Sequence, residues 1–151
     1  MRAFILAFLL AAIVKPSICV SQSAARERGV YLTVFRSPAT GIELRAGHAA
    51  TYVGFYPTVI SRDGKRANAN FIRAGFSYYV KEDGPSPYLS PSMLVSLGSD
   101  WKSGMLNEIG YRGRLYGRVN GRVGAAVLTT FDGQVRVNPT IGLDLKLGAS
   151  R

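Results

Sequence analysis

Few residues in this chain have side chains suited to acid–base or nucleophilic chemistry. His48 is the single histidine among 151 residues, and Cys19 is the single cysteine. A histidine can act as a general base toward a serine when a carboxylate fixes its tautomer, and Ser77 and Glu43 are the candidate partners. No motif spacing joins these three residues, and His48 follows Gly47, where a turn is expected. We therefore expect a turn histidine, no catalysis, no metal site and no cofactor.

Charged side chains form a second group of candidates. They recur at alternate positions of segments whose other positions are apolar, so we expect them on one face of β-strands. The interior of an eight-stranded barrel is only wide enough for side chains, and charges placed there must pair. Arginine suits such pairing because its planar guanidinium can bridge two carboxylates. The expected polar lumen network comprises Glu43, Arg45, Arg73, Glu108, Arg112, Arg114, Arg118, Arg136 and Asp144. Its role is expected to be structural, and an anion path or ligand pocket is the alternative.

The N-terminus has the pattern of a secretory signal. Arg2 provides a positive charge, and residues 3–14 form an apolar run that is too short to span a bilayer as a helix. Small residues then allow cleavage after Ser23 or after Ala25. We therefore predict a signal peptide over residues 1–25 and one domain over residues 26–151, with an uncleaved N-terminal anchor as the alternative.

Cleavage would change both the thiol content and the charge. Cys19 would leave with the signal, and Ile18 before it is too large for a lipoprotein site, so we expect neither a disulfide nor a lipid anchor. The complete chain has a net charge of +10; loss of Arg2 and Lys15 leaves seventeen basic and nine acidic residues, a net charge of +8. Such an excess favours anionic partners, and export argues against nucleic acid.

The remainder of the chain has a hydrophobic period of two, with turn signals about every ten residues. Asn120-Gly121 and Asp132-Gly133 are the strongest hairpin signals. The pattern gives eight segments, or seven if the chain does not turn at Gly47-His48. Two segments, 50–60 and 122–131, show no clear division between an apolar and a polar face. The eight segments are centred near residues 30, 42, 53, 75, 92, 111, 126 and 141.

The last segment, 135–147, shows the clearest alternation. Its odd positions are apolar throughout, and its even positions are polar except for Gly142. A water-soluble barrel turns its apolar face inward, whereas a membrane barrel turns that face toward lipid and fills its lumen with polar side chains. Alternation alone does not distinguish the two. Segments of nine to eleven residues match a tilted membrane crossing, which favours the membrane barrel.

Aromatic residues near the ends of the expected strands also favour a membrane barrel. Aromatic girdles at both membrane interfaces are typical of such proteins. In a soluble barrel, we would expect more of these side chains in the middle of strands, facing inward. The residues concerned are Phe35, Tyr78, Tyr79, Tyr88, Trp101 and Phe131.

The C-terminal strand contains the most specific motif. Thr140, Gly142, Leu145 and Leu147 occupy the polar, glycine and two hydrophobic positions of the signal by which bacterial outer-membrane barrels are recognised during assembly. Two features differ from that family: the hydrophobic positions hold leucine where aromatic residues are usual, and residues 148–151 follow the motif. In length and pattern the chain resembles the small eight-stranded outer-membrane proteins of the OmpA/OmpX type. This resemblance implies contact with the barrel-assembly machinery and with outer-membrane lipid.

A basic turn within residues 61–68 is a candidate contact for such lipid. Arg62, Lys65 and Arg66 could hold lipopolysaccharide phosphates by charge-assisted hydrogen bonds if the turn faces outside the cell. A solvated loop with no specific partner is the alternative.

These observations predict an all-β, up-and-down antiparallel barrel, with eight strands, in the cell outer membrane. We expect a structural or envelope-interaction role and no nucleic-acid partner; the pattern sets no oligomeric state. The first alternative is a soluble periplasmic or secreted lipid-binding barrel. The second is a barrel enzyme that modifies lipid A, with His48 as its base.

Overall fold

A computed structural model describes residues 28–34, 40–62, 65–98 and 102–147, apart from the side chains of residues 60–62 and 65–67. The predicted signal peptide, Phe35, Trp101 and the last four residues lie outside these ranges. The described residues include no helix that is long and apolar enough to cross a membrane. They form eight strands: β1 (Arg28–Val34), β2 (Thr40–Ala46), β3 (Ala49–Arg62), β4 (Lys65–Tyr79), β5 (Ser86–Ser96), β6 (Gly104–Tyr116), β7 (Val119–Thr130) and β8 (Val135–Leu147).

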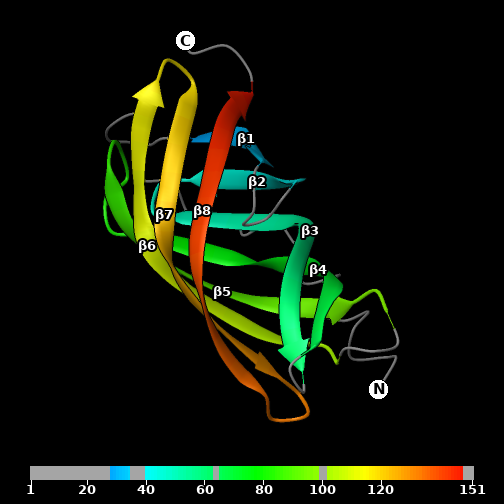
Figure 1. Cartoon of the computed structure of the whole chain (residues 1–151). Coiled ribbons are helices and arrows are strands. Elements are labelled where there is room, and N and C mark those ends of the chain that lie inside the picture. The colour runs from blue at the N-terminus through cyan, green and yellow to red at the C-terminus, as the bar shows by residue number, and fades with distance from the viewer. Residues whose placement is uncertain (1–27, 35–39, 63–64, 99–101, 148–151) are drawn as a thin grey trace, which may run out of the picture.

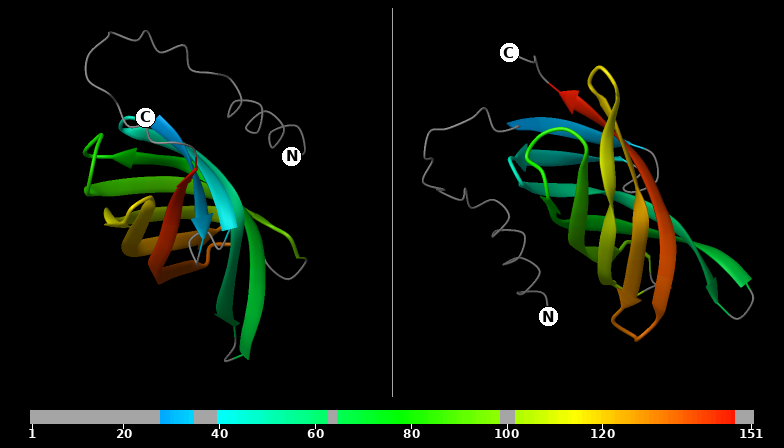
Figure 2. Two further views of the ribbon diagram at one scale, coloured as in Figure 1. Left: turned by 90° about the horizontal axis from the view of Figure 1, so that it is seen from above. Right: turned by 90° about the vertical axis from the view of Figure 1, so that its left-hand side faces the viewer.

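The strands form one closed barrel (Figure 1). Each strand pairs antiparallel with the next in the sequence, and β1 pairs antiparallel with β8 to complete the circle, for example through Leu32 and Leu145. The β3–β4 hairpin extends beyond the neighbouring strands, as both views in Figure 2 show. The predicted fold class, an all-β up-and-down barrel of eight strands, is confirmed.

Tight turns fix the strand count. Gly47 and His48 form a two-residue turn between β2 and β3, with Gly47 at φ 62°, so the chain does reverse there. The predicted turn at Asp132-Gly133 lies between β7 and β8, with Gly133 at φ 86°. Glycine adopts such positive φ angles without steric cost.

The predicted hairpin turn at Asn120-Gly121 is wrong. Both residues lie within β7, where Asn120 pairs with Arg114, and the turn falls at Gly117-Arg118. A turn at 120–121 would shift the β6–β7 pairing by an odd number of residues. Such a shift would reverse the faces of β7 and turn Arg122 out of the barrel. Packing of the inward side chains of β7 therefore determines the register, against the local preference of Asn-Gly for a hairpin turn.

The outward face of the barrel is apolar and exposed. On β6, Ile109 is 65% exposed, and on β8, Val137 is 70% exposed. Among the described residues of β2, β5, β7 and β8, no exposed side chain carries a charge. The inward face of the same strands contains buried charged residues, including Glu43, Arg122 and Asp144. The distribution is the inverse of a water-soluble barrel, in which the apolar face is inside.

Side chains fill the lumen in two parts. The half toward the β5–β6 and β7–β8 connections contains an apolar cluster, which we call the apolar plug. The half toward the chain termini contains the charged residues. This layering explains why residues 122–131 show no polar face in the sequence: Ala126 and Leu128 point inward between outward-facing Val123 and Val127. The apolar plug consists of Tyr56, Ala69, Phe71, Leu94, Leu106, Ala126 and Leu128.

Candidate functional site

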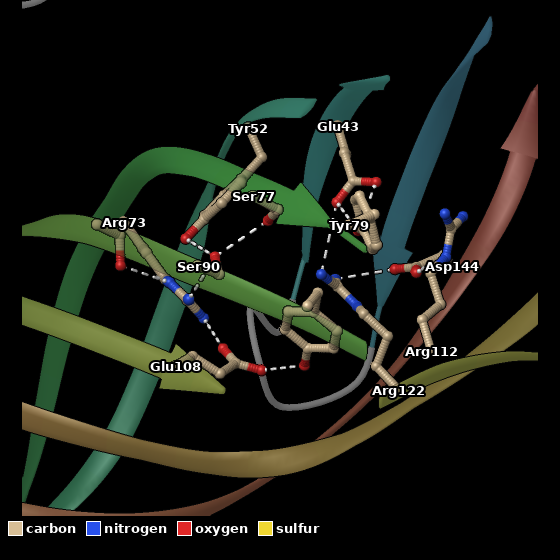
Figure 3. A network of polar contacts seen from close by, with 12 residues as sticks. Glu43, Tyr52, Arg73, Ser77, Tyr79, Ser90, Glu108, Arg112, Arg122 and Asp144 are labelled. Carbon is tan, nitrogen blue, oxygen red and sulfur yellow. Dashed lines mark hydrogen bonds and ion pairs between the residues drawn. The ribbon is translucent and has the colours of Figure 1, made fainter. Parts of the chain in front are cut away.

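An ion pair between Arg73 of β4 and Glu108 of β6 lies inside the barrel (Figure 3). Arg73 Nη1 lies 2.7 Å from Glu108 Oε2, and both side chains are 2% exposed. The Tyr88 hydroxyl donates to the other carboxylate oxygen, Oε1, at 2.5 Å. Arg73 Nε donates to Ser92 Oγ at 3.0 Å, and Ser92 in turn donates to the carbonyl of Leu106. Both charges therefore have several hydrogen-bond partners, which offsets the cost of burying them.

A hydroxyl cluster extends this pair along the inner faces of three neighbouring strands. Ser90 Oγ lies 2.8 Å from the Tyr52 hydroxyl and accepts a hydrogen bond from Ser77 Oγ at 3.0 Å. Arg73 Nη2 also donates to Ser90 Oγ, at 3.4 Å. The cluster joins β3, β4 and β5 through side chains in addition to the backbone ladder, because its members come from all three strands.

A second charged cluster is centred on Arg122 of β7. Its Nη2 lies 2.8 Å from Asp144 Oδ1, and its Nη1 lies 3.5 Å from Glu43 Oε2. Arg112 Nε lies 3.1 Å from Asp144 Oδ2, so this carboxylate is held between two guanidinium groups. The Tyr79 hydroxyl donates to Glu43, with 3.1 and 3.2 Å to the two carboxylate oxygens. Arg122 thus bridges two carboxylates on separate strands, as Figure 3 shows.

Arg45 closes the lumen at the end near the termini. It is 4% exposed, and its guanidinium lies over the ring of Tyr79, 3.9 Å from the centroid. Its Nε donates to the carbonyl of Gly47, and its Nη2 donates to the carbonyls of Lys81 and Glu82. Arg45 therefore ties the β2–β3 turn to the β4–β5 connection and covers the charged half of the lumen.

The structure places most of the expected lumen residues inside the barrel. Arg136 is half-buried on the inward face of β8. Arg114 and Arg118 are exposed and lie outside the lumen, which corrects the expectation for these two residues. Arg114 lies one inward position beyond Arg112, at the rim, and Arg118 lies in the β6–β7 turn. The buried members are Glu43, Arg45, Arg73, Glu108, Arg112 and Asp144.

Sequence reasoning missed Arg122, which contacts two carboxylates of this network, Glu43 and Asp144. The turn expected at Asn120-Gly121 placed it at the first position of the segment 122–131, which showed no clear polar face. Tyr79 and Tyr88 were expected in an aromatic girdle, but they are buried at 0% and 2% exposure. Tyr79 follows exposed Tyr78, and Tyr88 precedes exposed Leu89. Because successive side chains of a strand point to opposite faces, an outward position for Tyr78 and Leu89 predicts an inward position for Tyr79 and Tyr88.

The histidine lies apart from the serine and the carboxylate considered with it. His48 Nδ1 donates to the carbonyl of Tyr79 at 2.8 Å, and Nε2 lies 3.3 Å from Glu82 Oε1. Its ring stacks on Tyr78, with 5.7 Å between the centroids. Ser77 and Glu43 form the separate contacts given above, so no serine–histidine–carboxylate arrangement forms among these residues. The described ranges also hold no group of three or more His, Cys, Asp or Glu residues able to bind a metal ion.

The residues of the C-terminal motif divide between the two faces of β8. Thr140 and Gly142 are buried and face inward, whereas Leu145 and Leu147 are exposed. Gly142 pairs with Arg122 across the β7–β8 ladder.

The basic turn lies at the tip of the extended β3–β4 hairpin. Arg62 ends β3 and pairs with Lys65 at the start of β4, and Arg66 pairs with Ser61. The side chains of these four residues lie outside the described part of the structure. Their backbone positions place them at the barrel end opposite the termini.

Comparison with known proteins identified no relative. No protein-family model, no curated protein and no solved structure matches this chain.

Proposed function

We propose that this protein is an integral β-barrel of a bacterial outer membrane, with a structural or envelope-interaction role and no catalysis. One observation carries the proposal: apolar side chains cover the outward face, while ion pairs such as Arg73–Glu108 are enclosed in the lumen. In a membrane, lipid would remove these outward apolar side chains from water. Burial of apolar surface is the dominant favourable term in the free energy of folding, so such an outward face is favourable in lipid.

The exposed apolar residues surround the barrel completely. A typical soluble monomer exposes no contiguous apolar patch larger than a few hundred Å². Here every strand contributes to one continuous belt, and a single protein partner could cover only part of it. Representative members, one for each strand from β1 to β8, are Val30, Ile42, Val53, Phe76, Leu89, Ile109, Val123 and Val137.

Strand lengths and exposed aromatic residues also support a membrane location. Six of the eight described strands have eleven or more residues, and about ten residues suffice for a tilted crossing. Tyr78, Tyr111 and Tyr116 are exposed toward the termini, and Phe131 is exposed near the opposite end. Aromatic side chains favour the two membrane interfaces, so their positions suit the edges of a lipid-facing belt.

The filled lumen supports a structural role over conduction. The apolar plug occupies one half, the ion pairs occupy the other, and Arg45 covers the end near the termini. The soluble lipid-binding alternative requires a cavity lined by the apolar face, but that face points outward. The enzymatic alternative requires His48 to act on a serine, and Ser77 is bonded to Ser90 instead.

Heat-modifiability on SDS gels tests the proposal. Closed membrane barrels resist SDS until they are boiled, so we expect protein folded in detergent to migrate differently in boiled and unboiled samples. We also expect the expressed chain to fractionate with the outer membrane and to need detergent for solubility. A single band in both samples, from a chain that stays soluble without detergent, would contradict the proposal and revive the soluble barrel.

A further inference from the structure

Two arginines at the rim of the barrel take no part in the lumen network. Arg114 lies near the end of β6, and Arg118 lies in the β6–β7 turn; both are exposed. In the part of the chain that the structure describes, neither guanidinium forms an ion pair. The segment 109–123 around them contains no acidic residue. The hairpin therefore presents two positive charges with no compensating carboxylate of its own.

Between these arginines, the hairpin exposes two large apolar side chains. Leu115 is 65% exposed and Tyr116 is 85% exposed. The strand pairing is irregular between Arg114 and Tyr116, and the Leu115 side chain lies over Gly121, where an added methyl carbon would be 2.9 Å from Leu115 Cδ1. These residues continue the outward belt, since Tyr111 and Val123 precede and follow them on the same hairpin.

The backbone holds this hairpin tip in a defined position. Gly117 provides the positive φ of 50° that the turn requires, and Lys146 N donates to the Arg118 carbonyl at 3.0 Å. The turn is thereby fastened to β8 beside the barrel wall; Figure 1 shows the β6–β7 turn and the end of β8 at the same end of the barrel. Arg28, at the start of β1, is also exposed at this rim, because β1 pairs with the end of β8.

The neighbouring β4–β5 connection at the same rim has a different charge. The β4–β5 connection contains Glu82 and Asp83 next to Lys81, and Glu82 lies 3.3 Å from His48. Positive charge without adjacent carboxylates is therefore a property of the β6–β7 side and not of the whole rim.

We propose that the β6–β7 hairpin is a binding site for the phosphate headgroups of anionic glycerophospholipids. Arg114 and Arg118 bind the phosphate oxygens through charge-assisted hydrogen bonds, for which the planar guanidinium is well suited. Leu115 enters the boundary of the acyl chains, and Tyr116 lies at the headgroup level with its hydroxyl toward water. Basic residues next to an apolar surface are attracted to anionic lipid in this way. This inference rests on the proposed membrane location.

Lipid selectivity measured by electron paramagnetic resonance tests the inference. The full-length protein is reconstituted in phosphatidylcholine vesicles that contain spin-labelled phosphatidylcholine or spin-labelled phosphatidylglycerol. The motionally restricted fraction reports lipid bound at the protein surface. For the wild-type protein we expect a relative association constant about two- to fivefold higher for phosphatidylglycerol at low salt, and a lower preference at high salt.

Two double variants with the same change in net charge provide the comparison. R114Q/R118Q is expected to reduce the selectivity to a ratio near one. K81Q/K102Q removes two exposed charges elsewhere, one on the β4–β5 side of the rim and one at the opposite end, and is expected to keep the wild-type ratio. An equal loss in both variants would overturn the site, because net charge alone would then explain the preference. A wild-type ratio of one would also overturn it.

The experiment separates this inference from the function on which it rests. Absence of any motionally restricted lipid would mean that the protein does not enter the bilayer, which contradicts the proposed function itself. Restricted lipid without selectivity would leave the membrane barrel in place and reject only the headgroup site. The heat-dependent gel shift of each variant establishes that it is folded before its selectivity is measured.

Discussion

Arg122 and Asp144 form an ion pair inside the barrel, with 2.8 Å between Nη2 and Oδ1 and with side chains that are 6% and 0% exposed. Arg122 also reaches Glu43 on β2, 79 residues away in the sequence. Since β2 and β7 are not neighbours in the barrel, this guanidinium links two non-adjacent strands through the lumen. The Arg122–Glu43 contact therefore connects strands that no backbone hydrogen bond joins.

Replacement of Arg122 by methionine should be strongly destabilising. The substitution leaves Glu43 without this partner and Asp144 with Arg112 alone, and removal of one member of a buried ion pair costs about 3–5 kcal/mol. Urea unfolding in lipid vesicles measures the change in the free energy of unfolding. The matched control is Lys81→Met, which removes a positive charge at an exposed position and should change stability by less than about 0.5 kcal/mol. Equal effects of the two substitutions would refute the bridging role.

Gly110 provides a steric test of the lumen around Glu108. A methyl carbon at Gly110 would lie 2.5 Å from the carbonyl oxygen of Val123 and 2.7 Å from the Tyr88 hydroxyl. Gly110→Ala should therefore displace Tyr88 from Glu108 and reduce the free energy of unfolding by about 1–3 kcal/mol. Gly113→Ala on the same strand is the control, since its added methyl carbon would meet nothing closer than 3.9 Å. Unfolding midpoints that do not differ between the two variants would show that the lumen adapts to the extra methyl group.

Ile109 and Leu115 allow a test of the lipid-facing belt within one strand. Both are 65% exposed, but Ile109 lies near the middle of β6 and Leu115 near its end. An arginine near the bilayer midplane of a membrane barrel costs about 2–4 kcal/mol, whereas near the interface it costs about 1 kcal/mol or less. Ile109→Arg should thus lower stability in vesicles far more than Leu115→Arg. In water both sites are equally solvated, so similar small effects would favour a soluble protein.

Arg45 should control access to the charged half of the lumen. Arg45→Ala removes the donors to the carbonyls of Gly47, Lys81 and Glu82, so the β4–β5 connection loses two hydrogen bonds that hold it to β2, while the contacts of His48 with Tyr79 and Glu82 remain. We expect backbone amides of residues 80–86 to exchange with deuterium faster, with little change in the apolar plug. Lys81→Ala is the control because its side chain is exposed. Unchanged exchange in Arg45→Ala would mean that the connection is held by other contacts.

The sequence predicted the fold well because half-buried antiparallel strands have a period of two. The alternation of residues 135–147 gave the faces of β8 correctly, and the turn signals gave eight strands. It did not identify the partners in the lumen, because those depend on register. Arg122 meets Asp144 and Glu43 only when β6 and β7 pair with the turn at Gly117-Arg118, and the local preference of Asn120-Gly121 predicts another register.

Strands with two apolar faces limited the prediction in a second way. Ala126 and Leu128 point into the apolar plug while their neighbours point outward, so residues 122–131 show little alternation. Similarly, Tyr52 and Tyr56 face inward between outward-facing Val53 and Phe55, which made residues 50–60 ambiguous. Packing against distant strands determines which of two apolar faces fills the lumen. The residues of a single segment therefore do not predict it.

Single-cysteine spin labelling along β8 tests the central claim most directly. In a Cys19→Ser background, nitroxide labels at successive positions from 135 to 147 are probed in vesicles with oxygen, which concentrates in lipid, and with a water-soluble nickel complex. Our account predicts high oxygen accessibility at odd positions such as Val137 and Ile141, and low accessibility to both reagents at inward Thr140 and Asp144. If the odd positions were accessible to the nickel complex instead, the apolar face would lie in water, and the membrane barrel would be wrong.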